Sequence, residues 1–315
     1  MSQINYPKVQ MVTVDEGSEG QRIDNYLIKI LKGVPKSRIY RIIRKGEVRV
    51  NKGRIKQTYR LKLDDIVRVP PVRVAESDGP IRVGKEPLQR LQQSIIFEDS
   101  RFLILNKPSG MAVHGGSGLS YGVIEGLRAL RPDAPYLELA HRLDRDTSGC
   151  LVIAKRRSAL RGFQMQQQEG NIDKHYLALL QGEWQGERRK IDVPLKKNEL
   201  RSGERVVRVN PEGKRAISIF TPIERFKGAT LMRIKLLTGR THQIRVHAQH
   251  SGHPIAGDPK YGDEPFNREM AGLGLRRLYL HAESIHFTLP EVMTYDIKAP
   301  LDPRLEEILG KLEKA

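Results

Sequence analysis

A polar segment between two strand-length apolar runs constrains this sequence most. The segment, 141–149, contains two aspartates, two arginines and a histidine, and it ends in Thr-Ser-Gly, which has turn chemistry. The flanking runs, 136–140 and 150–154, have the length and the leucine and β-branched content of strands. The pattern predicts a rigid polar loop whose carboxylate could be a nucleophile or a general base. The alternative is a charged hairpin with Asp–Arg pairs at the surface.

The charge of the chain indicates a polyanionic partner. Its 315 residues include 55 Lys and Arg against 37 Asp and Glu, a net charge of +18. The segment from Gly20 to Arg73 contains 16 basic and 4 acidic residues, so two-thirds of the excess charge lies in about one-sixth of the chain. This pattern is typical of nucleic-acid binding. An anionic membrane is the alternative, but no basic amphipathic helix with a bulky aromatic face is evident.

Length and cysteine content narrow the class of protein. The chain is long enough for two domains, it has no run of eighteen apolar residues, and it begins without an apolar signal region. Its one cysteine, Cys150, lies in an apolar run and cannot form an internal disulfide, and there is no Cys-x-x-Cys metal pattern. We expect a cytoplasmic protein with a buried, unreactive cysteine.

The basic segment is predicted to form two helices followed by short strands. Apolar residues recur at helical spacing over 23–31, and a second helix begins at 36 or 37 and ends before Gly46. Alternation over 48–50 and 66–69 predicts strands. The second helix carries a basic stripe that suits phosphate contacts along structured RNA, although a solvated helix face is the alternative. The stripe consists of Arg38, Arg41, Arg44 and Lys45.

This segment resembles the S4 RNA-binding domain over about 50 residues. The resemblance is carried by Arg22-Ile23-Asp24, Ser37-Arg38 and Gly46-Glu47-Val48-Arg49-Val50-Asn51. One departure is Asp64-Asp65, where the family usually has Gly-Asp. We place an S4-like domain at 20–80. The stretch from Val72 to about Gln93 shows no clear periodicity and has prolines at or near it (Pro70, Pro71, Pro80 and Pro87), so we place a linker over 81–93.

Two further motifs flank the central loop in the sequence. Predicted strands at 94–98 and 102–105 lead into Lys107-Pro108-Ser109-Gly110, and His114 follows beside two glycines. His114 could contact a phosphate or a base, although a lone histidine is more often structural. A clean strand over 230–237 enters the stretch 238–245, where Thr241 is expected to cap a helix. Four histidines lie in and just after this stretch: His242, His247, His250 and His253. They have no cysteine or carboxylate partners at the spacing of metal ligands, so we predict no metal site.

The other expected elements complete the domain. Helices are predicted around 123–130, over 158–168 and at the C-terminus, and strands are predicted over 174–180, 279–281 and 285–287. The basic segment 182–215 suggests hairpins, either exposed or in contact with RNA.

The three motifs in this order closely resemble the RluA-type pseudouridine synthases. They are Lys107-Pro108-Ser109-Gly110…His114, His141-Arg142-Leu143-Asp144…Thr147-Ser148-Gly149 and Thr238-Gly239-Arg240-Thr241-His242-Gln243-Ile244-Arg245. The resemblance implies an α+β fold, with a curved mixed, mainly antiparallel sheet and flanking helices over 94–315. It also implies that uridines in large-subunit ribosomal RNA, or in a ribosomal precursor, are isomerised without a cofactor. We expect a monomer with no membrane partner.

The resemblance also assigns roles to individual residues. Asp144 matches the catalytic aspartate of the family, and Arg245 matches the basic residue that pairs with it and favours its ionised form. Tyr176, in Lys174-x-Tyr176, matches the tyrosine that packs on the uracil and helps to remove the proton at C5. Arg142 matches the residue that takes the place of the extruded base, and Asp146 is expected to be a turn residue.

Two other functions are compatible with these residues. A non-enzymatic RNA-binding or ribosome-assembly factor would retain the basic surface but show no turnover. An N-glycosylase would also need a carboxylate and a flipped base, but it would release free uracil. The sequence does not distinguish attack on the base, attack on the sugar and removal of a sugar proton.

Overall fold

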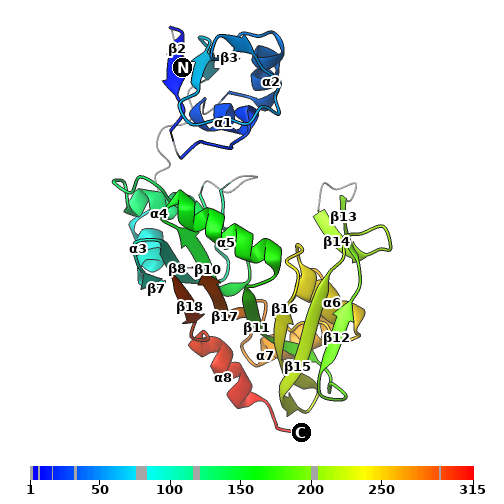
Figure 1. Ribbon diagram of the computed structural model, residues 1–315. Coiled ribbons are helices and arrows are strands. Elements are labelled where there is room, and N and C mark those ends of the chain that lie inside the picture. The colour runs from blue at the N-terminus through cyan, green and yellow to red at the C-terminus, as the bar shows by residue number, and fades with distance from the viewer. Residues whose placement is uncertain are drawn as a thin grey trace. The chain divides into compact units, whose positions relative to one another are not determined.

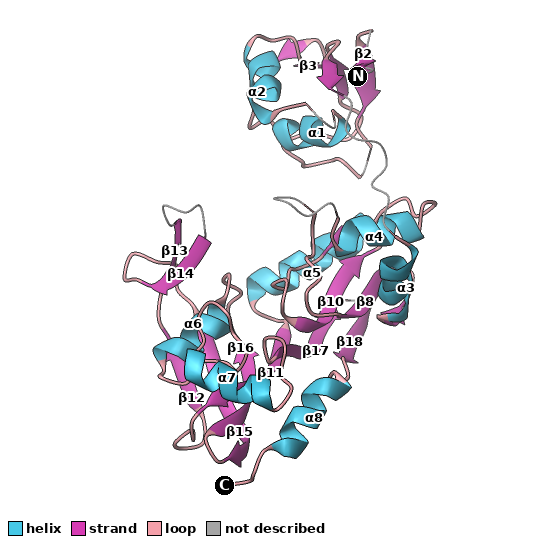
Figure 2. Cartoon of the chain, turned by 180° about the vertical axis from the view of Figure 1, so that it is seen from behind, coloured by secondary structure: helices cyan, strands magenta, loops and turns pink. Residues whose placement is uncertain are grey.

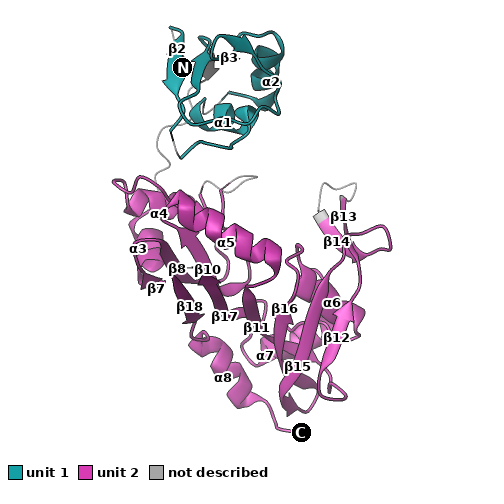
Figure 3. Ribbon diagram, in the orientation of Figure 1, with its two compact units in different colours: residues 1–82 teal, residues 83–315 magenta. Residues whose placement is uncertain are grey.

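The chain folds into two compact units, residues 1–82 and 83–315 (Figures 1 and 3). The computed structural model describes all residues except 1–2, 6–7, 16, 32–33, 76–83, 116–120, 200–204 and 291. Each unit has its own hydrophobic core, one around Leu27, Ile39 and Val67, and the other around Phe102, Leu151 and Phe287. The helices of the described residues are all too short or too polar to cross a membrane.

The first unit packs two helices against a small antiparallel sheet. Helix α1 (Ile23–Ile30) buries Ile23 and Leu27, and helix α2 (Lys36–Arg44) buries Ile39, Ile42 and Ile43, so both predicted helices are confirmed. The sheet has the order β2-β5-β3-β4, and β1 pairs separately with β6. The strands are β1 (Gln3–Asn5), β2 (Gln10–Thr13), β3 (Arg49–Val50), β4 (Gly53–Arg54), β5 (Ile66–Val69) and β6 (Arg73–Ala75).

The Asp64-Asp65 pair has a structural explanation. Asp64 has φ +63°, a left-handed conformation that glycine adopts at the lowest energetic cost and that aspartate tolerates. The buried Asp65 carboxylate then accepts hydrogen bonds from the Asn51 amide, the Tyr59 hydroxyl and the Lys62 backbone N–H. The departure from Gly-Asp therefore preserves the turn.

The second unit is built on a ten-stranded mixed sheet, which confirms the expected fold class. The main path has the order β12-β15-β16-β11-β17-β10-β8-β7, with β18 paired to β17 and β9 paired to β10. Every pair is antiparallel except β10–β17. The strands are β7 (Ile95–Glu98), β8 (Phe102–Lys107), β9 (Glu138–Leu139), β10 (Ser148–Ala154), β11 (Asp173–Gln181), β12 (Arg189–Asp192), β15 (Ile217–Phe226), β16 (Ala229–Leu236), β17 (Leu280–Leu289) and β18 (Met293–Lys298).

Helices cover both faces of this sheet, as Figures 1 and 2 show. Helix α5 packs on β10 and β17, whereas α6 packs against β15 on the other face. A separate hairpin, β13 (Leu195–Glu199) with β14 (Arg205–Val209), contacts α6. The helices are α3 (Lys85–Gln93), α4 (Val123–Leu130), α5 (Arg157–Glu169), α6 (Gln243–His250), α7 (Glu264–Gly272) and α8 (Pro303–Lys311).

Three local predictions were wrong, and one helix was missed. Residues 85–93, expected to belong to the linker, form helix α3, because Leu91 is buried against the core and α3 packs on α4. Helix α7 was not predicted, although Asp263 caps it and proline follows. The two strands expected at 279–281 and 285–287 are one strand, β17. Helix α6 begins after His242, not at Thr241, and has no side-chain cap.

Candidate active site

The backbone of the loop around Asp144 is held by the Lys-Pro-Ser-Gly motif. The Lys107 ammonium group is fully buried and donates to the carbonyls of Pro108, Met111 and Arg145 at 2.9, 2.9 and 3.0 Å. The Ser109 hydroxyl donates to the Asp146 carbonyl at 2.7 Å. Gly110 exchanges two hydrogen bonds with Arg145. Since three donors need a protonated amine, this lysine clamps the loop even though burial lowers its pKa to about 7.

The end of the loop is fixed by a close approach between two strands. Gly149 has φ +107°, and a Cβ at this position would lie 2.2 Å from the carbonyl oxygen of Ala282. Only glycine therefore lets β10 reach its parallel partner β17 here. Next to it, the Ser148 hydroxyl bonds His281 Nδ1 at 2.9 Å and accepts from Arg277 at 2.6 Å.

Asp144 lies beside a buried arginine from the third motif. Its side chain is 19% exposed, and its Oδ2 is 3.8 Å from Nη1 of Arg245, which is only 5% exposed. Arg245 also forms a two-pronged pair with Asp258, with Nε–Oδ2 and Nη2–Oδ1 distances of 2.7 Å each. Asp258 thus holds the guanidinium so that its remaining edge faces Asp144.

His242 approaches the same carboxylate oxygen from another direction. Its Nε2 is 3.9 Å from Asp144 Oδ2, and its Nδ1 is 2.8 Å from the hydroxyl of Tyr261. The Tyr261 ring lies 5.0 Å from the Arg245 guanidinium carbon, within the range of a cation–π contact. Two side chains around Asp144 are therefore linked through one tyrosine.

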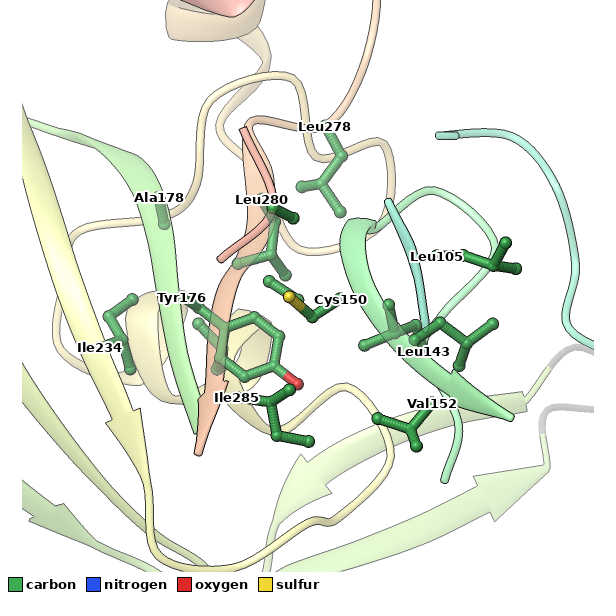
Figure 4. Packing of buried hydrophobic residues seen from close by; sticks show 14 of the residues in the cluster. Leu105, Leu143, Cys150, Val152, Tyr176, Ala178, Ile234, Leu278, Leu280 and Ile285 are labelled. Carbon is green, nitrogen blue, oxygen red and sulfur yellow. The ribbon is translucent and has the colours of Figure 1, made fainter. Parts of the chain in front are cut away.

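Tyr176 lies on β11. It is 7% exposed, and its ring lies among Cys150, Leu280 and Ile285 (Figure 4). The β11–β17 register shifts between His175 and Tyr176, an irregularity that re-aims a side chain. Burial, and next the charge of Asp144, raise the pKa of the Tyr176 phenol, so it stays protonated at neutral pH.

The other predicted residues lie outside this cluster. Arg142 and His114 are exposed, and within the described residues their side chains have no hydrogen bond or ion pair. On α2, Arg38, Arg41 and Arg44, together with Lys45 at its C-terminal cap, are all exposed and have no acidic partner in the described part of the first unit. We refer to these four as the α2 cations.

Cys150 and His141 have structural roles. Cys150 is buried, and burial raises the pKa of its thiol to about 12, which matches the expectation of an unreactive cysteine. His141 accepts from the Val152 N–H at 3.2 Å and stacks on Phe163, and burial lowers its pKa to about 3. Nowhere in the described ranges do three or more His, Cys, Asp or Glu side chains gather as metal ligands would.

Sequence reasoning missed Asp258 and Tyr261, and it considered His242 only as a metal ligand. The signal lay in Gly257-Asp258-Pro259-Lys260-Tyr261-Gly262, a turn-rich stretch with one acidic and one aromatic side chain. Nothing in its spacing shows that it folds back onto α6.

Comparisons with known proteins agree on one family. Residues 101–250 match the family described as RNA pseudouridylate synthase, and residues 21–67 match the S4 domain. The chain is 58% identical over 308 residues to "Ribosomal large subunit pseudouridine synthase C" of Pasteurella multocida, covering 97% of this chain and 94% of that protein. The protein of the same name from Escherichia coli is 56% identical over 315 residues, with 98% of each chain covered.

A solved structure supports the same fold. "Human RNA Pseudouridylate Synthase Domain Containing 1" aligns with a TM-score of 0.59 and 25% sequence identity. The alignment covers 70% of this chain and 88% of that one.

Proposed function

The chain belongs to the RNA pseudouridine synthase family, and from this premise we propose that it isomerises specific uridines of large-subunit (23S) ribosomal RNA to pseudouridine. The activity follows from the family. The choice of ribosomal RNA rests on the names of the relatives and on the S4 domain. The observation that carries the chemistry is the Asp144 carboxylate, partly exposed on a clamped loop and 3.8 Å from a buried arginine.

We assign the reactive carboxylate to Asp144. The reaction breaks the N1–C1′ bond of uridine, turns the uracil, forms a C5–C1′ bond and moves the C5 proton away, while N1 gains a proton. Atoms therefore balance without a cofactor. A carboxylate can take part by attacking the sugar or the base, or by removing a sugar proton, and each role needs it ionised and fixed. Arg245 supplies the charge and Asp258 fixes the arginine.

We assign Tyr176 to the face of the uracil. A protonated phenol at the edge of the apolar core can pack on a flat base, and its hydroxyl can take part in proton removal at C5. The free protein keeps this phenol neutral because burial disfavours the phenolate.

RNA contacts are assigned to exposed cations and to His114. Arg142 is two residues from Asp144 and exposed, so its side chain is free to fill the gap left by the flipped nucleotide and offset part of the unstacking cost. The α2 cations lie in the S4-like domain, placed at 20–80, and we assign them to phosphates. The catalytic domain is placed at 83–315, because α3 packs on α4 within this unit, with a single chain as the working unit in the cytoplasm.

Tritium release from large-subunit ribosomal RNA labelled at uridine C5 tests the proposal. Wild type is expected to release tritium without free uracil, and Asp144→Asn is expected to release none while its RNA Kd changes less than about twofold. Release by the variant would refute the role of Asp144, and free uracil would indicate a glycosylase. No release by wild type from either naked RNA or ribosomal precursors would refute the proposed substrate.

A further inference from the structure

His242 adopts a backbone conformation that needs an explanation. It has φ +54° and ψ 19°, a left-handed conformation uncommon for residues other than glycine, asparagine, aspartate and histidine. The buried Gln243 amide holds this turn with four hydrogen bonds: it accepts from Thr238 Oγ1 and Arg240 N–H, and donates to Ile217 O and Ser218 Oγ. Backbone strain of this kind is concentrated at functional sites.

We infer the proton position on His242 from the hydrogen bonds of Tyr261. The Tyr261 hydroxyl oxygen accepts from the Val207 N–H at 2.9 Å, so its own proton is available for His242 Nδ1 at 2.8 Å. With Nδ1 as acceptor, the neutral ring carries its proton on Nε2, the atom nearest Asp144 Oδ2.

Oδ2 is the oxygen of Asp144 that Arg245 and His242 both approach. The Arg245 Nη1 and His242 Nε2 atoms lie 3.8 and 3.9 Å from it, longer than a hydrogen bond, so in the described part of the chain neither carboxylate oxygen accepts one in the free protein. We propose that His242 and Tyr261 are positioning residues: His242 presents a neutral N–H to Asp144 Oδ2 and thereby directs Oδ1 at the reacting nucleotide, and Tyr261 fixes the ring that does so. This inference rests on the proposed role of Asp144.

Charges around His242 are consistent with a neutral donor. Burial lowers the pKa of His242, Asp144 and Asp258 raise it, Arg245 and Lys260 lower it, and the net direction is down. The ring therefore adds a hydrogen-bond donor without a second positive charge. Arg245 places a positive charge beside the carboxylate, and His242 restricts its rotation.

The same contacts connect the site to the basic hairpin. Val207, on β14, packs with Leu195, Val246 and Tyr261 in a small apolar cluster separate from the main core. Its N–H is the donor to Tyr261, so the seating of the hairpin on α6 determines where the tyrosine hydroxyl lies.

Four variants of the full-length protein test the inference. His242→Asn tolerates the left-handed backbone but is too short to reach both partners, whereas His242→Gln spans a similar distance with one acceptor and one donor. Tyr261→Phe keeps the ring over Arg245 but removes the hydroxyl. Tyr279→Phe is the matched control, because its buried hydroxyl donates to the Leu305 carbonyl away from Asp144.

The readouts are the single-turnover rate at saturating ribosomal RNA and the RNA Kd, with Asp144→Ala alongside. We expect His242→Asn and Tyr261→Phe to slow turnover about tenfold, because the carboxylate would lose a contact that positions it, with Kd within about twofold. His242→Gln should recover most of the rate, Tyr279→Phe should match wild type, and the double variant with His242→Asn and Tyr261→Phe should be no slower than the slower single variant.

Any of three results would overturn the inference. The first is a wild-type turnover rate for His242→Asn, and the second is weaker RNA binding with an unchanged turnover rate. The third is a double variant whose turnover is reduced by the product of the two single reductions. A His242→Gln protein as slow as His242→Asn would refute the donor role. If Asp144→Ala turned over, the proposed function itself would fail. If Asp144→Ala were inactive and His242→Asn unaffected, only this inference would fail.

Discussion

Replacing Asp258 by asparagine tests how Arg245 is held beside Asp144. The Asp258 carboxylate is fully buried, and it accepts two hydrogen bonds from Arg245 and two from the backbone N–H groups of Lys260 and Tyr261. The Asp258→Asn side chain would keep the shape but lose the charge, and its amide nitrogen would face a donor. Breaking a buried pair in this way typically costs about 3–5 kcal/mol.

The magnitude agrees with an independent estimate. Hydrogen bonds to charged groups contribute about 1.5–3 kcal/mol each, and Asp258→Asn would lose one of the two with Arg245 and weaken the other, which gives roughly 2–5 kcal/mol. For a unit the size of residues 83–315, such a loss corresponds to a fall in Tm of roughly 10 °C. Urea titration followed by Trp184, the single tryptophan, reports on this unit.

The pH dependence gives a further check with a defined sign. Burial raises the pKa of Asp258, but the hydrogen bonds and charge of Arg245 outweigh it and hold the pKa below its usual value. Because the pKa of Asp258 is lower in the folded than in the unfolded protein, its ionised carboxylate stabilises the fold fully at pH values above the unfolded-state pKa, which is near 4. This stabilisation is lost as the pH falls from there through the folded-state pKa. The difference in free energy of unfolding between wild type and Asp258→Asn should therefore shrink below about pH 4.

A matched double variant separates charge from packing. In Asp258→Asn with Arg245→Met the unpaired cation is gone, so part of the stability should return, whereas turnover should be absent because Asp144 has lost its arginine. An Asp258→Asn protein destabilised by less than about 1 kcal/mol would refute the reasoning, because it would mean that Arg245 finds another partner or that water reaches the pair.

Three other perturbations have defined outcomes. Gly149→Ala should lower the free energy of unfolding, measured by urea titration, by more than about 3 kcal/mol, because the new methyl group would collide with the Ala282 carbonyl. Gly170 also has a left-handed backbone but has open space around it, so Gly170→Ala should lower the free energy of unfolding by only about 1 kcal/mol. Equal losses in the two variants would contradict the close approach at Gly149. Neutralising the four α2 cations should reduce the steepness of log K for RNA binding against log salt concentration by about 3. Arg268→Gln changes an arginine already paired with Glu264, so it should leave this slope unchanged. An unchanged slope in the first variant would mean that α2 does not contact the RNA. Tyr176→Phe should keep RNA affinity but reduce tritium release at least about 100-fold, and full release would refute a role for its hydroxyl.

The sequence predicted the elements that have a strong local signal. The helices of the first unit, the strands on both sides of Asp144 and the loop between them follow from hydrophobic periodicity and turn residues. Helix α3 was missed because proline and polar residues dominate a segment in which one buried leucine determines the packing. Local pattern could not show that β17 enters the middle of the sheet.

In the site, too, the sequence predicted the residues that belong to local motifs and missed those that depend on long-range contacts. Asp144, Tyr176 and Arg245 came from motifs that resemble a known family, and their roles stay predictions. Asp258 and Tyr261 depend on a turn that brings residues 257–262 back against α6, and hydrogen bonds across such distances leave no trace in spacing. The left-handed backbone of His242 is likewise set by Gln243, through contacts with residues that lie 25 and 26 positions away.

The place of β17 has a consequence for synthesis of the protein. This strand pairs with β10, which follows the Asp144 loop, and with β11, which carries Tyr176, so it joins the two parts of the site. It is also made after both of them, at residues 280–289. A nascent chain that ends before it has two unpaired central strand edges and no fixed spacing between Asp144 and Tyr176. Ribosome-bound intermediates should therefore be inert and prone to aggregate until β17 has emerged.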